Sequence, residues 1–205
     1  MNQKTALKQL KFIENHDSIK SMRLAAENWT SDFQILVSTI LSARTRDEVT
    51  IPTAENLFRK FPTAEKLSKA KIQDVMKIVK PVNFYRNKSR NVISCAKKIC
   101  EDYNKKIPRE IDELVNLSGV GRKTASVFIS ELGKDAIAVD THVAYISQKL
   151  GWTKNKNPEK IEDDLKKLFP KNMWKVINPA LVRFGKTHTS RKQKDGVLEE
   201  IKKVK

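Results

Sequence analysis

A lysine and an aspartate are the residues of this sequence best suited to covalent chemistry. Lys123 follows two glycines in LSGVGRKTA (117–125), and Asp140 stands in AVDTHV (138–143). We expect each residue at the start of a helix, where the helix dipole favours a neutral amine and a carboxylate caps the first amides. A neutral amine is a nucleophile, and a carboxylate can stabilise positive charge or transfer a proton, which suits attack at a sugar carbon. Taken singly, each residue has a simpler interpretation that is favoured over the chemical one: Lys123 as a surface lysine that contacts phosphate, and Asp140 as only a helix cap.

The glycines before the lysine predict a tight turn that exposes backbone amides. Gly119 and Gly121 flank Val120, a small apolar residue that can point inward and anchor the turn. Exposed amides followed at once by a helix N-terminus form an anion site, and a glycine lets a phosphate approach because it has no Cβ. By itself the Gly-Val-Gly motif is equally compatible with an ordinary turn between two helices.

The charge of the chain favours a polyanionic partner. Its 205 residues contain 41 lysines and arginines against 24 acidic residues, a formal net charge of +17. Such an excess usually indicates nucleic acid, although a solvated basic face is the simpler alternative. The two cysteines, Cys95 and Cys100, can build neither a disulfide framework nor a four-cysteine metal or cluster site.

Helical periodicity predicts an all-α protein. Apolar residues between Phe33 and Leu41 recur at the spacing of one helix face, and Ser31 stands where the N-cap of that helix would be. We expect about ten to twelve helices of average length or shorter. The sequence shows no signal-peptide core and no apolar run of membrane-spanning length, which predicts a soluble, cytoplasmic or otherwise intracellular protein.

In combination, these motifs resemble the endonuclease III branch of the helix-hairpin-helix (HhH-GPD) DNA glycosylases. The resemblance covers about residues 20 to 190 and is carried by LVNLSGVGRKTA, AIAVDTHV, LVSTILSARTRDEVT, PVNFYRNK and INPALVRFGKTHT. It implies an all-α, two-lobed fold with a DNA-binding cleft between the lobes. The expected domains are a helical bundle at 25–135 and a second helical domain formed by 1–24 plus 136–205.

The resemblance also implies a bifunctional DNA glycosylase and AP lyase of base excision repair. Lys123 matches the Schiff-base lysine of the family and Asp140 its essential aspartate. The substrate would be an oxidised pyrimidine such as thymine glycol, flipped out of duplex DNA. A thymine or uracil mismatch glycosylase is the alternative enzyme, although several such relatives replace the lysine, often by tyrosine. A non-catalytic DNA-binding module is the alternative from another class, but it would not need Asp140 opposite Lys123.

Further positions match DNA contacts of the family. Arg44 stands where many relatives have glutamine, and Phe84 stands where many have leucine or another bulky apolar group. Both would enter the space that the flipped base leaves, and the arginine could change the preferred opposing base. Asp47 matches a residue near the lesion pocket. The hairpin contributes the remaining expected DNA contacts, which are Gly119, Val120, Gly121, Arg122 and Thr124.

Most members of this branch carry an iron–sulfur cluster, which this sequence cannot ligate. Thr189 stands where the first cluster cysteine would be, no cysteine follows it, and the cluster needs four thiolates. We therefore expect no iron–sulfur cluster, a possible monovalent cation at the hairpin, and a tail held by a short helix that includes Val197, Ile201 and Val204. We further expect a monomer that binds double-stranded DNA with a damaged or mismatched base or an abasic site, associated with the nucleoid if the cell is prokaryotic.

Two other departures concern loop geometry. Ser118 replaces a common proline and should make the hairpin slightly more mobile, because it loses the preset φ. Asn83 replaces a common glycine before Phe84, and asparagine tolerates a positive φ better than most residues.

Overall fold

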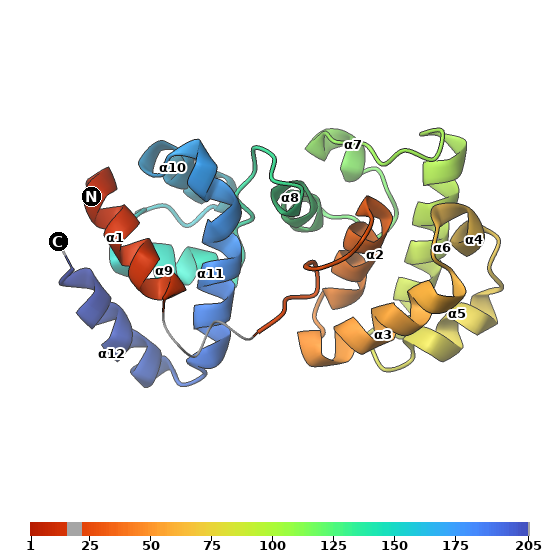
Figure 1. Ribbon diagram of the computed structural model, residues 1–205, viewed down its shortest axis with the longest axis horizontal. Coiled ribbons are helices and arrows are strands. Elements are labelled where there is room, and N and C mark those ends of the chain that lie inside the picture. Colours follow the sequence, from red (N-terminus) through yellow and green to blue (C-terminus); the bar gives the residue numbers. More distant parts are fainter. Residues whose placement is uncertain (16–21, 205) are drawn as a thin grey trace. The chain divides into compact units, whose positions relative to one another are not determined.

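All regular secondary structure in the described part of the chain is helical. The computed structural model describes residues 1–15 and 22–204, and within these ranges it contains helices and no strand (Figure 1). The predicted all-α class is therefore confirmed. The chain divides into a central unit, Arg23–Leu132, and a terminal unit, Met1–Met22 with Gly133–Lys205.

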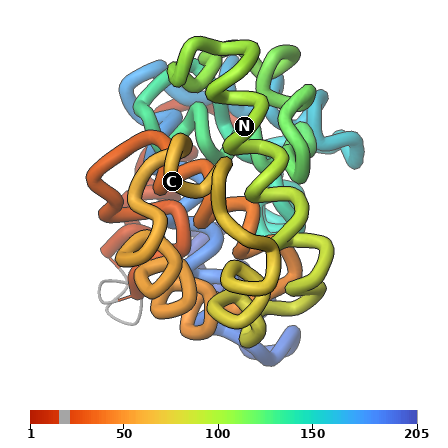
Figure 2. The backbone as a smooth tube through the Cα atoms, turned by 90° about the vertical axis from the view of Figure 1, so that its right-hand side faces the viewer, coloured from red at the N-terminus to blue at the C-terminus, as the bar shows by residue number. Residues whose placement is uncertain are grey.

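The central unit is organised around one buried helix, α2 (Asp32–Ser42). As predicted, Ser31 caps it by accepting a hydrogen bond from the Gln34 amide. The other helices of the unit are α3 (Asp47–Lys60), α4 (Ala64–Ser68), α5 (Ile72–Val79), α6 (Tyr85–Glu101), α7 (Ile111–Leu114) and α8 (Arg122–Glu131). Helix α2 packs against α3, α6 and α8, while α4 and α5 pack against the long helix α6 (Figure 2). The loops at both ends of α6 are thereby fixed to the core.

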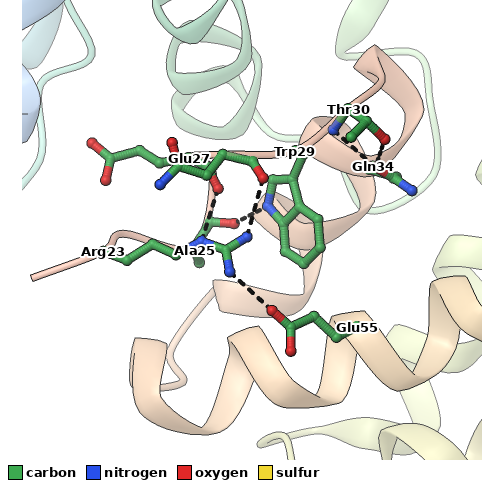
Figure 3. A network of polar contacts seen from close by, with 8 residues as sticks. Arg23, Ala25, Glu27, Trp29, Thr30, Gln34 and Glu55 are labelled. Carbon is green, nitrogen blue, oxygen red and sulfur yellow. Dashed lines mark hydrogen bonds and ion pairs between the residues drawn. The ribbon is translucent and has the colours of Figure 1, made fainter.

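The first segment of the central unit is fastened to α3 through Arg23 (Figure 3). The guanidinium donates to the carbonyl of Glu27 at 3.1 Å, pairs with Glu55 of α3 at 2.9 Å, and lies 4.6 Å from the centre of the Trp29 ring. Trp29 Nε1 donates to the carbonyl of Ala25 at 2.7 Å. One arginine therefore joins the start of this unit to its helical core.

The terminal unit is built from both ends of the chain. Its elements are α1 (Gln3–Glu14), α9 (Thr141–Leu150), α10 (Pro158–Leu168), the short 3-10 helix η2 (Lys171–Met173), α11 (Trp174–Thr187) and α12 (Arg191–Lys202). Helix α1 packs against both α11 and α12, so the first and last helices lie side by side (Figure 1). Trp152 Nε1 donates to the buried Gln9 side chain at 2.7 Å, which joins α1 to the loop after α9.

The C-terminal tail forms the predicted helix. Leu198 and Ile201 of α12 are buried in the core of the terminal unit, whereas Val204 lies beyond the end of the helix. Asp195 of α12 accepts hydrogen bonds from the Tyr145 hydroxyl and from Lys149, which lies 3.1 Å away. The bond from Tyr145 lowers the pKa of Asp195 below its ordinary value. Apolar burial and this polar contact together hold the tail on α9. None of the helices described by the structure combines the length and apolar character needed to cross a membrane.

Candidate active site

The glycine hairpin connects α7 to α8 and has the expected inward anchor. The side chain of Val120 is 5% exposed, and its amide donates to the carbonyl of Leu117 at 3.0 Å. Gly121 is the N-cap of α8, so no N-cap side chain covers the first amides of that helix. The Ser118 hydroxyl lies 2.8 Å from that of Ser94 on α6. This contact restrains the turn at Ser118, the residue that was expected to make the hairpin slightly more mobile.

The two glycines of the hairpin are required for different reasons. Gly119 has φ +82°, and a Cβ there would lie 2.9 Å from the Cβ of Asn91 and 3.2 Å from Ile40. Backbone conformation and packing on α6 and α2 therefore both exclude a side chain at Gly119. Gly121 has no left-handed backbone, and a Cβ there would enter open space. Of the two hairpin glycines, Gly121 is the one whose backbone has open space on the side where a Cβ would lie, and a ligand can approach it there.

Lys123 and Asp140 occupy the helix starts that the sequence predicts. Lys123 is the second residue of α8 in the central unit and is exposed. Asp140 is the N-cap of α9 in the terminal unit, and its Oδ1 accepts from the amides of His142 and Val143 at 2.8 Å each. Its role as a cap is confirmed. That the two side chains face each other stays a prediction.

Arg44 and Phe84 are brought together at an exposed tip of the central unit. Arg44 follows α2, Phe84 is the N-cap of α6, and the guanidinium carbon lies 4.9 Å from the centre of the ring. The Phe84 side chain is 54% exposed, which is unusual for a phenylalanine. A core role for Phe84 is thereby excluded, and a flat ring and a flat cation are presented as one surface.

The unusual backbone lies at different residues from those expected. Arg44 has φ +56° and Phe84 has φ +58°, whereas Asn83 has no positive φ. The position of Asn83 therefore does not need the positive φ that asparagine tolerates. Its side chain instead donates to the carbonyl of Arg44, and its amide donates to Thr45 Oγ1 at 3.1 Å. Asparagine serves here as a cross-link between two loops.

Lys88 is the residue that sequence reasoning missed. It is 6% exposed, and burial lowers its pKa to about 8. Its ammonium donates to the carbonyls of Leu41 and Ala43 and to Thr45 Oγ1. The signal in the sequence was its place on the apolar stripe of α6, at helical spacing before Val92.

The remaining predicted site residues lie near these features. Asp47 is the first residue of α3 and is buried, Arg122 is exposed and Thr124 is half-buried. His142 packs against Gly185, where a Cβ would lie only 2.1 Å from His142 Nδ1. This close contact gives His142 a structural role at the start of α9.

The residues after α11 do not fit an iron–sulfur cluster. Thr189 is exposed, and the neighbouring His188 is buried with its Nδ1 3.0 Å from the carbonyl of Phe184. The two free cysteines, Cys95 and Cys100, lie on α6 in the other unit. Among the residues that the structure describes, no group of three or more histidine, cysteine or acidic side chains could hold a metal ion. The chain offers no donor set for the cluster here.

Comparisons with known proteins agree with this geometry. A family model described as "HhH-GPD superfamily base excision DNA repair protein" matches residues 37–171. The chain is 42% identical to an endonuclease III of Thermotoga maritima over 158 residues, 77% of this chain and 74% of the relative. It is 37% identical to an endonuclease III of Bacillus subtilis over 161 residues, 78% of this chain and 74% of the relative.

Solved structures are similar over most of the chain. A trapped endonuclease III–DNA covalent intermediate in an estranged-adenine complex has a TM-score of 0.80 at 29% identity, covering 93% of this chain and 89% of that one. A thermostable thymine-DNA glycosylase has a TM-score of 0.78 at 20% identity, covering 89% and 85%. The second likeness shows the fold alone.

Proposed function

Because the chain belongs to the endonuclease III family of HhH-GPD base excision DNA repair proteins, we propose that it excises oxidised pyrimidines and nicks the strand through Lys123. The observation that carries this proposal is an exposed lysine in the first turn of α8, directly after the glycine hairpin. Most lysines are exposed, so the position of Lys123 directly after the hairpin, and not its exposure alone, supports the proposal. An amine at this place can reach a sugar of bound DNA.

The reaction begins with displacement of the base. The lone pair of Lys123 Nζ forms a bond to C1′ while the glycosidic bond breaks. The base leaves with the electron pair of the glycosidic bond and takes up a proton. Asp140 stabilises the positive charge that develops at the sugar or accepts the amine proton. Opening of the sugar ring then leaves a Schiff base between Lys123 and C1′.

Strand cleavage follows from the Schiff base. The imine makes the C2′ proton acidic, and its removal leaves an electron pair that forms the C2′–C3′ double bond. The C3′–O bond breaks, and the 3′ phosphate leaves with its electrons. Water hydrolyses the imine and returns the free amine of Lys123. Because the Schiff base permits this β-elimination, an enzyme with an amine nucleophile has lyase activity in addition to glycosylase activity.

The hairpin holds the DNA backbone during these steps. A phosphate at the open space before Gly121 would meet the positive end of the α8 dipole, and Arg122 and Thr124 extend this surface. Part of this binding could use a monovalent cation held by hairpin carbonyls. The +17 charge of the chain favours a polyanionic ligand. We propose that this ligand is duplex DNA with a damaged or mismatched base or an abasic site, and that the protein binds it as a monomer. We expect this enzyme to work without an iron–sulfur cluster.

Borohydride trapping tests the proposal. Wild-type protein and Lys123→Gln are incubated with duplexes that carry thymine glycol, a T·G mismatch or a U·G mismatch, and covalent adducts are measured. We expect wild-type protein to trap best on thymine glycol and Lys123→Gln to trap nothing while still binding DNA. Lys134→Gln, a change at an exposed lysine elsewhere in the chain, is the control.

Each other outcome is informative. Base release without trapping would mean a monofunctional enzyme and would favour the mismatch alternative. Binding without base release would favour the non-catalytic DNA-binding module. An adduct that persists in Lys123→Gln would assign the chemistry to another amine.

A further inference from the structure

The Lys88 ammonium occupies a position in the central unit that the proposed chemistry does not use. Its Nζ lies 2.7 Å from the carbonyl of Leu41, 2.6 Å from that of Ala43 and 2.9 Å from Thr45 Oγ1. An ammonium has three N–H donors, so these contacts use its full capacity. The cation lies at the C-terminal end of α2, where the helix dipole favours positive charge.

The bonds of Lys88 join helix α6 to the end of α2 and the loop after it, and the bonds of Asn83 join that loop to the loop before α6. The first loop follows α2 and carries Arg44, and the second precedes α6 and carries Phe84. Thr45 Oγ1 accepts hydrogen bonds from the Lys88 ammonium and from the backbone amide of Asn83. The side chain of Asn83 also donates to the carbonyl of Arg44. We call this cluster the Lys88 clamp. Its acceptors are Leu41 in the last turn of α2 and the three residues Ala43, Arg44 and Thr45 that include the tip.

The clamp supports an unfavourable local conformation. Arg44 and Phe84 both have a left-handed backbone, which is unfavourable for a residue with a Cβ. Burying the Lys88 cation is also unfavourable, and its lowered pKa reflects that cost. Strained residues persist where surrounding contacts determine them, and here they place a ring and a guanidinium side by side in solvent.

We propose that Lys88 is a positioning residue that holds Arg44 and Phe84 rigidly in the conformation in which they enter the DNA stack. This inference rests on the proposed function, because a rigid apolar wedge with a cation is useful where a base leaves a duplex. A loose tip would have to be ordered during each excision, and small misplacements of such groups are costly to the rate. Lys88 acts through the tip and does not touch the reacting sugar.

The test compares a reaction that needs the tip with one that does not. Base release is measured on a duplex with thymine glycol, and borohydride trapping on a single-stranded abasic oligonucleotide, which has no opposing base and no flipped base to replace. The variants are Lys88→Met, Lys88→Arg and Asn83→Ala. Lys98→Met is the matched control, because Lys98 lies on the same helix and pairs with Asp102 in a surface i,i+4 contact.

We expect Lys88→Met to slow base release about 10- to 100-fold while trapping on the single strand stays within about twofold of wild type. Asn83→Ala should also slow base release more than it slows trapping on the single strand. Lys88→Arg should slow base release less than Lys88→Met does. If Lys88→Met does not fold, Lys88→Arg still tests the role of Lys88, and Asn83→Ala, at an exposed residue, tests the rest of the clamp.

A purely structural role has a different signature. If folded variants lose both reactions in equal proportion, or neither, Lys88 only closes the end of α2 and the proposal is wrong. If wild-type protein neither releases the base nor traps, the proposed function itself fails, which is a distinct result. A second readout is the fluorescence of 2-aminopurine placed opposite the lesion. This fluorescence should rise when wild-type protein binds the DNA, and it should rise less when Asn83→Ala binds.

Discussion

The guanidinium carbon of Arg44 lies 4.9 Å from the centre of the Phe84 ring, and both residues have a left-handed backbone. They are 40 positions apart in a helical protein, yet they form one exposed surface. A planar cation and an aromatic ring can each stack on a base. Two residues that the sequence presents separately therefore form one structural feature, the exposed tip. The contributions of Arg44 and Phe84 to it can be tested independently.

Arg44→Gln should change the preference for the opposing base. Arginine has only donors and suits the two acceptors of guanine, whereas glutamine has a donor and an acceptor and suits adenine. We expect the rate ratio of base release opposite guanine over adenine to fall about tenfold. Arg44→Lys, which keeps the charge but not the fork, is the control. An unchanged ratio in Arg44→Gln would mean that Arg44 does not contact the opposing base.

Asp140→Asn should separate capping from chemistry. Asparagine caps a helix about as well as aspartate, so the melting temperature should stay close to that of wild type. Base release should slow at least about 100-fold, because the amide carries no charge and accepts no proton. Asp140→Ala should also lose about 1 kcal/mol of stability with the cap. A wild-type rate in Asp140→Asn would leave the residue as a cap only.

The two hairpin glycines should respond differently to alanine. Gly119→Ala should lower the free energy of unfolding by about 2 kcal/mol, because of its positive φ and the short contact with Asn91. Gly121→Ala should change it by less than about 0.5 kcal/mol but weaken DNA binding, since its methyl group enters the space proposed for the phosphate. Chemical denaturation and DNA titrations measure the two effects. Equal DNA affinity of Gly121→Ala and wild type would exclude a phosphate at this place.

Lys88 should make stability depend on pH in the alkaline range. Burial lowers its pKa from 10.5 to about 8 in the folded protein. Between these values the unfolded chain binds more protons, so the contribution of Lys88 to the free energy of unfolding rises as the pH increases. Urea denaturation of wild type and Lys88→Met at pH 7.5 and pH 10 isolates this contribution as a difference. A difference that is the same at both pH values would contradict the lowered pKa.

The tail should depend on apolar burial. Ile201→Ala removes a side chain with no exposed surface and should cost about 2–4 kcal/mol, whereas Lys202→Ala beside it should cost less than about 0.5 kcal/mol. The purified protein should also lack the visible absorbance of an iron–sulfur cluster. A brown preparation, or a tail indifferent to Ile201→Ala, would contradict this account of the C-terminus.

Features that depend on neighbouring residues could be predicted from the sequence. Gly119 and Gly121 bend the chain before α8, Asp140 caps α9, and Ser31 caps α2, because each contact spans only a few positions. The apolar spacing likewise predicts the helices, and the combination of motifs predicts the family. The place of Lys123 in the first turn of α8 could be predicted because its position relative to the hairpin is local.

The conformation of the exposed tip was decided by tertiary structure. Lys88 binds Leu41 and Ala43 from 47 and 45 positions away, and Asn83 binds Thr45 from 38 positions away. No local rule assigns a positive φ to Arg44 or Phe84, because both conformations are unfavourable for the isolated residues. Packing of α2 against α6 brings the loops together, and the buried cation then holds them in place. Long-range contacts can stabilise a backbone state that the local sequence disfavours, which is why the folded chain was needed to identify Lys88.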